Sequence, residues 1–308
     1  MHVALVYPEG WNPAVRRPTP VAGQPPGCRA GEAVEGADSA MPVLHDDRPS
    51  ATIARLLLGR QLEQLRTVRG LTLEQVASAL YVSASKLSRI ERGRHRAAVD
   101  DVVRLADFYH LHGLERDRLM ERSGQAQGRS AYHSFADVAD ASFRDYLDVE
   151  AAGVYAVYMP QVLPAVVRTR RYARVLLGPV SSAEADRRLW LLDLRQQRFF
   201  QARRAPVRIL LGESVLVPGL GGPRVMREQR RRLLQASAQV RVLAARRAAR
   251  AATGFAVAVL GGGQLTLAVR ERDDGRPCLI PDRQGRMAAR FEELWEAAAD
   301  FGGRAACP

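Results

Sequence analysis

The stretch that decides the fold reads Leu71-Thr-Leu-Glu-Gln-Val-Ala-Ser-Ala-Leu-Tyr-Val-Ser-Ala-Ser-Lys-Leu-Ser-Arg-Ile-Glu-Arg-Gly93. Thr72 and Gln75 form a capping-box pair, in which the hydroxyl and the amide each satisfy a free backbone N–H of the other. This pair predicts that a helix begins just after Thr72. The apolar residues of this helix recur at helical spacing and predict one buried face, made of Leu73, Val76, Ala77 and Leu80.

A second short helix is predicted after Ser83, a good N-cap residue. Leu87 and Ile90 give this helix its buried side. Only about three residues join the two helices, so they must cross steeply, and the small Ala77 permits the close approach. The pattern therefore predicts a helix-turn-helix.

The outward positions of the second helix are small, polar or basic and include no carboxylate: Ala84, Ser85, Lys86, Ser88 and Arg89. Arg92, Arg94 and Arg96 follow, with Glu91 as the one acidic residue nearby. A short helix with a small first turn and a cationic flank suits the major groove of double-stranded DNA. The alternative is an ordinary helical bundle with a solvated arginine face. The helix caps, the bounding Gly70 and Gly93, and the matched basic helix favour DNA binding.

Two segments, 66–72 and 83–93, resemble the phage-repressor-type (XRE) helix-turn-helix, and Ser83–Glu91 is especially similar to the version in actinomycete regulators. The resemblance implies an all-α, lambda-repressor-like domain. It also implies a structural ion pair between Arg66 and Glu91. Bases would face Ala84, Ser85 and Arg89, and phosphates would lie near Lys86, Ser88, Arg92 and Arg94. With the N-cap residues Thr72 and Ser83, these residues form the predicted DNA-binding set.

Two positions depart from the family pattern. Leu73 stands where the family usually has a glutamine that contacts the DNA backbone, so that contact is expected to be lost. Tyr81 occupies the turn position where glycine is common, and a tyrosine with positive φ carries strain. The turn is therefore expected to differ from that of other members.

Composition sets the wider limits. The chain has 308 residues, 47% of them hydrophobic, which suffices for two domains. The net charge is +13, and of the 46 basic residues only Lys86 is a lysine, which most simply reflects a GC-rich genome. Three scattered cysteines form neither a disulfide framework nor a metal-spaced cluster. No signal peptide or membrane span is evident, so we expect a cytoplasmic protein.

The sequence predicts a multidomain chain: an all-α helix-turn-helix domain over 51–126, a linker over 127–139 and a mixed α+β domain over 140–303. Residues 1–50 are rich in proline and glycine and are predicted to be disordered. Met41 is the hypothetical true start. Strands are predicted at 154–158, 207–212, 240–244, 254–260 and 264–270, and helices at 162–177, 183–203, 224–237 and 287–301.

The second domain resembles an uncharacterised domain often fused behind this helix-turn-helix in actinomycete regulators. The matching positions are Tyr158, Pro160, Pro164, Thr169, Tyr172 and Ala173, whereas Ala165 and Arg168 depart from the pattern. Members are antitoxin-like regulators, often encoded beside a small partner protein. The resemblance therefore implies a transcriptional regulator, expected to be a homodimer. The alternative is an antitoxin-like protein that binds a small partner and uses DNA binding for autoregulation. A small-molecule effector is also compatible with the second domain.

No motif asks for catalysis, a metal or a cofactor, so no enzyme is expected. The pair His110/His112 lacks a third ligand, and Gly261–Gly263 is interpreted as a hairpin turn. The basic Arg224–Arg250 segment is interpreted as a solvated or partner-binding face rather than a second DNA surface. Four acidic residues near the strand ends are interpreted as caps or ion-pair partners: Asp145, Asp148, Glu150 and Glu213. Three tyrosines are interpreted as core residues rather than pocket walls: Tyr155, Tyr158 and Tyr172.

Overall fold

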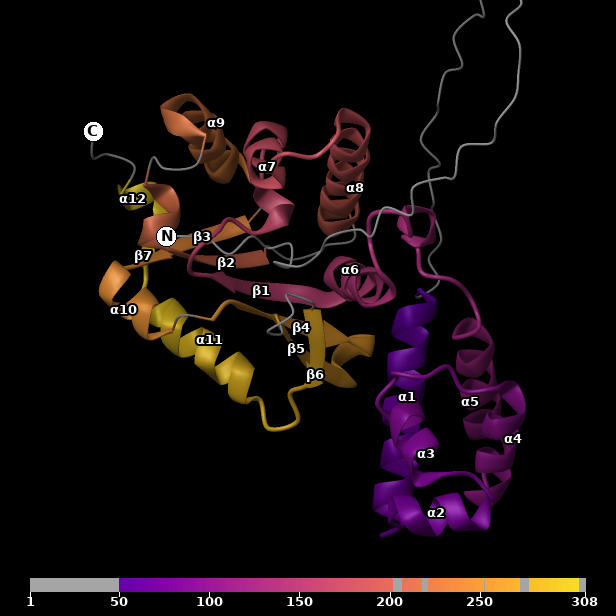
Figure 1. Ribbon diagram of the computed structural model, residues 1–308. Helices are drawn as coiled ribbons and strands as arrows, with labels where there is room; N and C mark the ends of the chain where they lie inside the picture. Colours follow the sequence, from indigo (N-terminus) through magenta and orange to yellow (C-terminus); the bar gives the residue numbers. More distant parts are fainter. Residues whose placement is uncertain are drawn as a thin grey trace, which may run out of the picture.

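The computed structural model describes residues 50–201, 207–217, 221–236, 238–251, 253–271 and 277–304. The predicted disorder of 1–50 and the hypothetical start at Met41 thus fall almost entirely outside the described residues. The first unit is helical: α1 Ala51–Val68, α2 Leu73–Ala79, α3 Ala84–Glu91, α4 Val99–Phe108 and α5 Gly113–Gln125 (Figure 1). Helices α2 and α3 form the predicted helix-turn-helix, with Gly70 before α2 and Gly93 after α3.

The second unit is built on a seven-stranded mixed sheet in the order β6-β5-β4-β1-β2-β3-β7. The central strands β1, β2 and β3 are parallel, and the others join the sheet antiparallel. The strands are β1 Val154–Met159, β2 Val207–Gly212, β3 Ala238–Leu243, β4 Phe255–Leu260, β5 Leu265–Glu271, β6 Pro277–Pro281 and β7 Ala299–Asp300. A helical domain followed by a mixed α/β domain confirms the predicted fold class.

Helices cover both faces of the sheet (Figure 1). One face packs against α6 Ala141–Gly153, α7 Arg170–Leu177, α8 Ser182–Gln201 and α9 Gly222–Gln235. The other packs against α10 Ala245–Arg250 and α11 Arg286–Glu296. Strand β1 serves both layers because alternate side chains point to opposite faces: Val157 enters the first core, and Ala156 and Tyr158 the second. A last helix, α12 Phe301–Arg304, follows β7.

Several predicted elements need correction. The helix expected over 162–177 begins only at Arg170, because Pro164 holds the chain extended and Thr169 caps α7. The helix expected over 287–301 ends at Glu296, and β7 follows. The sequence interpretation also missed α6, α10 and β6, whose patterns lack a clear apolar period. Within the described residues, no helix is long and apolar enough to cross a bilayer.

The stretch predicted as a linker, 127–139, is ordered and packed. Tyr132 is 0% exposed and Phe135 1% exposed, and both lie in the core of the second unit. The guanidinium of Arg187 stacks over the Phe135 ring, and that of Arg198 over the Tyr132 ring. This connection therefore holds the two units in a defined arrangement.

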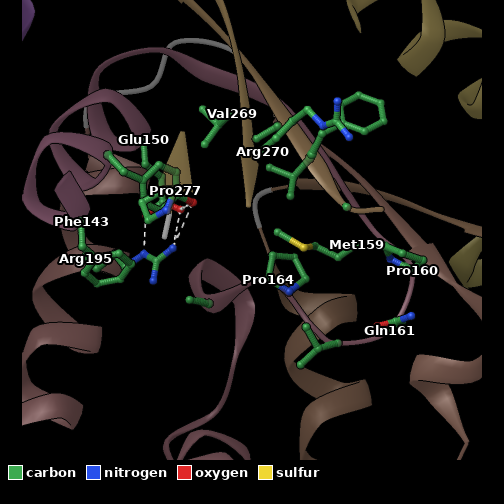
Figure 2. A pocket seen from close by; sticks show the side chains of 17 residues that line it. Phe143, Glu150, Met159, Pro160, Gln161, Pro164, Arg195, Val269, Arg270 and Pro277 are labelled. Atoms are coloured by element: carbon green, nitrogen blue, oxygen red, sulfur yellow. Dashed lines mark hydrogen bonds and ion pairs between the residues drawn. The ribbon is translucent and has the colours of Figure 1, made fainter. Parts of the chain in front are cut away.

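A buried polar network lies in the second unit, between α6 and α8 (Figure 2). Arg195 on α8 donates hydrogen bonds to both carboxylate oxygens of Glu150 on α6. The bond from Arg195 Nη2 to Glu150 Oε1 is 2.7 Å long. The hydroxyl of Tyr146 donates to Glu150 Oε1 at 2.5 Å. Burial raises the pKa of Tyr146, so this phenol stays protonated and remains a donor.

Helix α1 belongs to two cores at once. Ala54, Leu58 and Leu62 pack in the core of the helical unit. Ile53, Leu56 and Leu57 pack in the core of the second unit. Polar contacts also join α1 to α6 of the second unit: Arg55 Nη2 lies 2.6 Å from Asp145 Oδ2, and Thr52 Oγ1 lies 2.8 Å from Asp148 Oδ2.

Glycine is required where α1 crosses α3. A Cβ added at Gly59 would lie 2.5 Å from the carbonyl oxygen of Ile90 and 2.6 Å from that of Glu91. Both atoms are backbone, so the clash is relieved only by separating the two helices. The sequence interpretation placed the critical small residue at Ala77, and the structure adds Gly59.

We therefore expect Gly59→Ala to lower the free energy of unfolding by about 1–3 kcal/mol through overpacking. Chemical denaturation of the full chain, followed by circular dichroism, measures the change. Gly124→Ala is the control, because a Cβ there meets nothing within 4 Å and α5 gains helix propensity. Equal stability of the two variants would contradict the assigned role of Gly59.

Candidate DNA-binding surface

The two helices of the motif begin at side-chain caps. At α2, Gln75 N donates to Thr72 Oγ1 at 3.2 Å and Thr72 N donates to Gln75 Oε1 at 2.8 Å, which completes the capping box. At α3, Lys86 N donates to Ser83 Oγ at 3.1 Å. These capping hydrogen bonds are exposed to solvent, so the first turn of α3 lies at the surface of the domain.

The burial of α3 divides it into two faces. Leu87 is 1% exposed and Ile90 4% exposed, and both pack in the helical core. Ser85 and Arg89 are exposed, and Ala84 and Ser88 are partly exposed. The Arg89 guanidinium folds back along the helix, where Nε donates to the carbonyl oxygen of Ser85 at 3.3 Å. The predicted base-facing residues Ala84, Ser85 and Arg89 thus lie on the outer surface of one helix.

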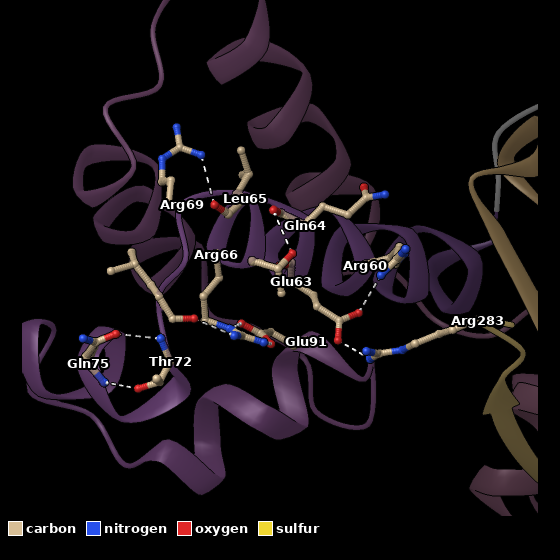
Figure 3. A network of polar contacts seen from close by, with 12 residues as sticks. Arg60, Glu63, Gln64, Leu65, Arg66, Arg69, Thr72, Gln75, Glu91 and Arg283 are labelled. Carbon is tan, nitrogen blue, oxygen red and sulfur yellow. Dashed lines mark hydrogen bonds and ion pairs between the residues drawn. The ribbon is translucent and has the colours of Figure 1, made fainter.

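Arg66 and Glu91 form the bond between α1 and α3 that Figure 3 shows. Arg66 Nε donates to Glu91 Oε1 at 2.7 Å, and Nη2 donates to Oε2 at 2.8 Å. Arg66 Nη1 also donates to the carbonyl oxygen of Leu71 at 2.9 Å, just before α2. Hydrogen bonding to Glu91 raises the pKa of Arg66. One guanidinium therefore holds the end of α3 and the entry to α2 against α1.

A second arginine, absent from the predicted set, binds the chain just beyond the same end of α3. Arg55 Nε donates to the carbonyl oxygen of Gly93 at 2.8 Å, directly beyond the helix. Gly93 has φ +63°, and a Cβ there would lie 2.8 Å from Leu56 Cδ2. A glycine is thus required for both its conformation and the close approach. No local sequence pattern identifies Arg55, because its partner lies 38 positions away.

Lys86 has a partner that the sequence interpretation did not predict. Its Nζ lies 2.6 Å from Asp101 Oδ2 on α4, and Arg104 Nη2 binds the other oxygen of Asp101 at 2.6 Å. Burial would raise the pKa of Asp101, but hydrogen bonds from Lys86 and Arg104 lower it below its usual value. Asp101 therefore stays ionised and draws Lys86 toward α4. The expected contact of Lys86 with a phosphate competes with this ion pair.

The arginines beyond α3 differ in their engagement. Arg92 and Arg94 are exposed, and within the described part of the chain neither guanidinium has a hydrogen bond or ion pair. Arg96 Nη2 donates to the carbonyl oxygen of Gly128 at 2.8 Å. Arg92 and Arg94 therefore keep their charge available to an anionic partner, and Arg96 is tied to the connection between the units.

The turn between α2 and α3 carries the unusual tyrosine. Tyr81 has φ 53° and is 95% exposed. The turn closes through Val82 N, which donates to the carbonyl oxygen of Ala77 at 2.9 Å. The expected positive φ at a non-glycine residue is confirmed, and the exposed ring relieves none of the strain by packing.

The carboxylates of the second unit are engaged in the protein itself. Asp145 pairs with Arg55, Glu150 with Arg195, and Glu213 Oε2 accepts a hydrogen bond from Ala245 N at 3.1 Å. Burial raises the pKa of Asp148. In the described ranges no group of three or more His, Cys, Asp or Glu is placed to hold a metal ion. The interpretation of these acids as caps and ion-pair partners agrees with their contacts.

Comparison with known proteins gives two matches. A helix-turn-helix domain family matches residues 57–119, the segment from the middle of α1 to α5. A family described as a domain of unknown function (DUF5753) matches residues 143–302, more than half of the chain. The chain belongs to the DUF5753 family. No curated protein and no solved structure matches it. Within this DUF5753 protein, the helix-turn-helix domain indicates a DNA-binding regulator of transcription.

Loss of the Glu91 carboxylate would leave Arg66 unpaired while its side chain is only 12% exposed. We expect Glu91→Ala to lower the free energy of unfolding by about 3 kcal/mol, because a charge is left without compensation in a largely buried place. Denaturant titration of the full chain gives this value.

The matched control is Asp107→Ala, which breaks the exposed pair between Asp107 and Arg116 in the same unit. Because water screens that pair, its loss should cost less than about 1 kcal/mol. A similar cost for both variants would mean that the Arg66–Glu91 pair does not hold α3 in place.

Proposed function

We propose that this DUF5753 protein is a sequence-specific transcriptional regulator of the phage-repressor (XRE) type that reads duplex DNA through α3. The observation that carries the proposal is the division of α3 into a face held by Arg66 and Arg55 and an outer face of Ala84, Ser85 and Arg89. A helix that is buried on its inner face, held by two arginines at its C-terminal end and bare on its outer face fits the requirements of base reading.

The charges around the outer face support this role. Arg92 and Arg94 flank the end of α3 with exposed guanidinium groups. Contacts of such groups with phosphates position a protein on DNA without reading its sequence. The small side chains of Ala84 and Ser85 let the first turn of α3 approach the base edges closely. Arg89 then supplies the group suited to paired hydrogen bonds with guanine.

We further propose that the protein binds as a homodimer on two half-sites. A single α3 presents three base-facing residues, of which only Arg89 is long enough for paired hydrogen bonds. Regulators of this kind gain affinity by placing two recognition helices about one turn of DNA apart. A two-fold symmetric operator is therefore expected.

Arg89→Ala should cost about 1–3 kcal/mol on the selected operator and relax the preference at one position of each half-site. The full chain first selects its operator from a randomised duplex pool, and quantitative gel shifts then compare this operator with single-base variants. Unchanged affinity and preference would show that α3 is not the reading helix.

Arg94→Ala should weaken operator and unrelated DNA alike and reduce the slope of log K against log salt by about 1, because a phosphate contact is lost. Arg118→Ala removes the same charge from α5 on the side that faces α1 and the β4–β5 turn, and it is the control. If Arg118→Ala lowers the slope as much as Arg94→Ala, the effect follows from net charge and not from contact at α3.

A further inference from the structure

A polar cleft opens between the helical unit and the sheet domain. Its walls come from α1, α5 and the β4–β5 turn, and its volume is about 290 Å³. The residues that line it are Leu57, Arg60, Gln61, Gln64, Arg118, Arg122 and Gln264. Three of these side chains are arginines and none is acidic, so the lining itself has an excess of positive charge.

Arg122 on α5 is the central cation of this cleft. Its Nη1 donates to Gln61 Oε1 on α1 at 2.7 Å, and its Nη2 lies 3.4 Å from Gln264 Oε1 in the β4–β5 turn. Both partners are neutral amides, and within the described residues no carboxylate pairs with Arg122. Burial lowers the pKa of this guanidinium, and the charge of the neighbouring Glu121 opposes the effect only in part. A partly buried charge without an opposite charge is unfavourable, and an anion from solution would compensate it.

Two further arginines line the cleft beside Arg122. Arg118 lies one helical turn earlier on the same side of α5, and it has no hydrogen bond or ion pair with any described residue. Arg60 pairs with Glu63, which Arg283 of the second unit also binds (Figure 3). Even when Glu63 is counted with the cleft, positive charge remains in excess there.

The glutamines of the cleft add hydrogen-bond donors for the same kind of ligand. Gln61 and Gln264 turn their Oε1 atoms toward Arg122, so their Nε2 groups remain available to donate. The side-chain amide of Gln64 makes no hydrogen bond with a described residue. The polar groups that face the cleft are thus mainly N–H donors, which favours a ligand rich in acceptor oxygens. A phosphate group meets this requirement, because guanidinium groups bind its oxygens through paired hydrogen bonds.

The position of the cleft excludes the phosphates of DNA bound at α3. Gly59 and Arg66 face α3 from one side of α1. Leu57, Gln61 and Gln64 lie on roughly the opposite side, because successive residues of an α-helix are rotated by about 100°. Helix α1 therefore stands between α3 and the cleft, and the phosphate that matches the cleft belongs to a small free molecule.

We propose that this cleft binds a small phosphate monoester, with the phosphate between Arg118 and Arg122 and a polar body against the glutamine amides, and that its occupancy changes the affinity for DNA. The volume leaves room for a body beyond the phosphate, because a cavity of about 150 Å³ already holds one benzene ring. The second part of the proposal rests on the proposed function, whereas the first does not.

Helix α1 connects the cleft to the reading helix. One side of α1 contributes Gln61 to the cleft, and the other side anchors α3 through Arg55 and Arg66. The β4–β5 turn packs against the same helix, since a Cβ added at Gly261 would lie 2.9 Å from Leu57 Cδ2. A ligand held jointly by the turn, α1 and α5 therefore acts on the helix that positions α3.

The ligand arm titrates ribose 5-phosphate, inorganic phosphate and ribose calorimetrically into the full chain, at constant ionic strength in a phosphate-free chloride buffer. Ribose 5-phosphate should bind at one saturable site, inorganic phosphate should compete for this site with lower affinity, and ribose should not bind. Failure of ribose 5-phosphate to saturate, or equal binding of ribose, would overturn the ligand site. Equal affinity for inorganic phosphate would overturn the assigned contacts of the polar body.

Arg118→Gln, at an exposed position that does not threaten folding, should weaken ribose 5-phosphate binding about tenfold or more, because a hydrogen bond between charged groups is lost. Arg122→Gln should have the same effect, and circular dichroism checks that this variant is folded. Arg116→Gln is the control, because it removes the same charge from α5 outside the cleft, where Arg116 pairs with Asp107. Unchanged affinity in Arg118→Gln, or an equal loss in Arg116→Gln, would overturn the assigned phosphate position.

The coupling arm measures binding of the selected operator with and without saturating ribose 5-phosphate. A change in Kd of about fivefold or more is expected, the usual size of coupling between two sites. At the same ligand concentration this change should shrink in Arg118→Gln and persist in Arg116→Gln. Ligand binding with an unaltered Kd for DNA would overturn the coupling and leave the ligand site standing. Absence of DNA binding both with and without the ligand would instead overturn the proposed function.

Discussion

The rest of the structure depends on the packing of α1 between two cores. Ala54, Leu58 and Leu62 bury one side of this helix against α3, α4 and α5, and Ile53, Leu56 and Leu57 bury the other against the second unit. Apolar burial is the dominant favourable term in folding, so neither side of α1 is free to expose itself without a large cost. The helix-turn-helix is therefore held in a fixed relation to the sheet domain. This differs from a module on a flexible linker, and it makes the position of α3 sensitive to whatever moves α1.

Arginine side chains make many of the hydrogen bonds and ion pairs at this junction and within the second unit. Arg66 and Arg55 each bind two elements at once, because the planar guanidinium presents several donors in a fixed geometry. In the sheet domain Arg208 pairs with Glu292 at 2.6 Å and lies over the Trp295 ring. The positive net charge is thus partly structural, whereas groups such as Arg92 and Arg94 remain open to an anion. Charge alone is a poor guide to function in this chain, and the distribution of partners is a better one.

The sequence predicted the helix-turn-helix well because its signals are local. Thr72 and Gln75 are three positions apart, and the apolar residues of α2 and α3 repeat within one or two turns. The sheet order, the cleft and the junction depend on contacts between distant positions, for example 45 positions between Glu150 and Arg195 and 90 between Arg55 and Asp145. A single sequence carries no sign of such pairings. The Arg66–Glu91 contact, 25 positions apart, was expected only through the resemblance to a known family. Lys86–Asp101 had no such support and was missed.

The junction also explains how a small structural change in the second unit alters the affinity for DNA. A ligand shifts an equilibrium only by the difference in its affinity for two conformations. A rigid junction turns a small movement of α6 into a movement of α1, because close-packed interiors do not absorb it. The recognition helix is tied to α1 more than to any other element: its inner face packs in the core that α1 helps to build, and both of its anchoring arginines, Arg55 and Arg66, come from α1, whereas Lys86 pairs with Asp101 on α4. Any displacement of α1 against a DNA-bound α3 must therefore be met by changes in the Arg55 and Arg66 contacts. Differential affinity between ligand-free and ligand-bound states would arise at those two side chains.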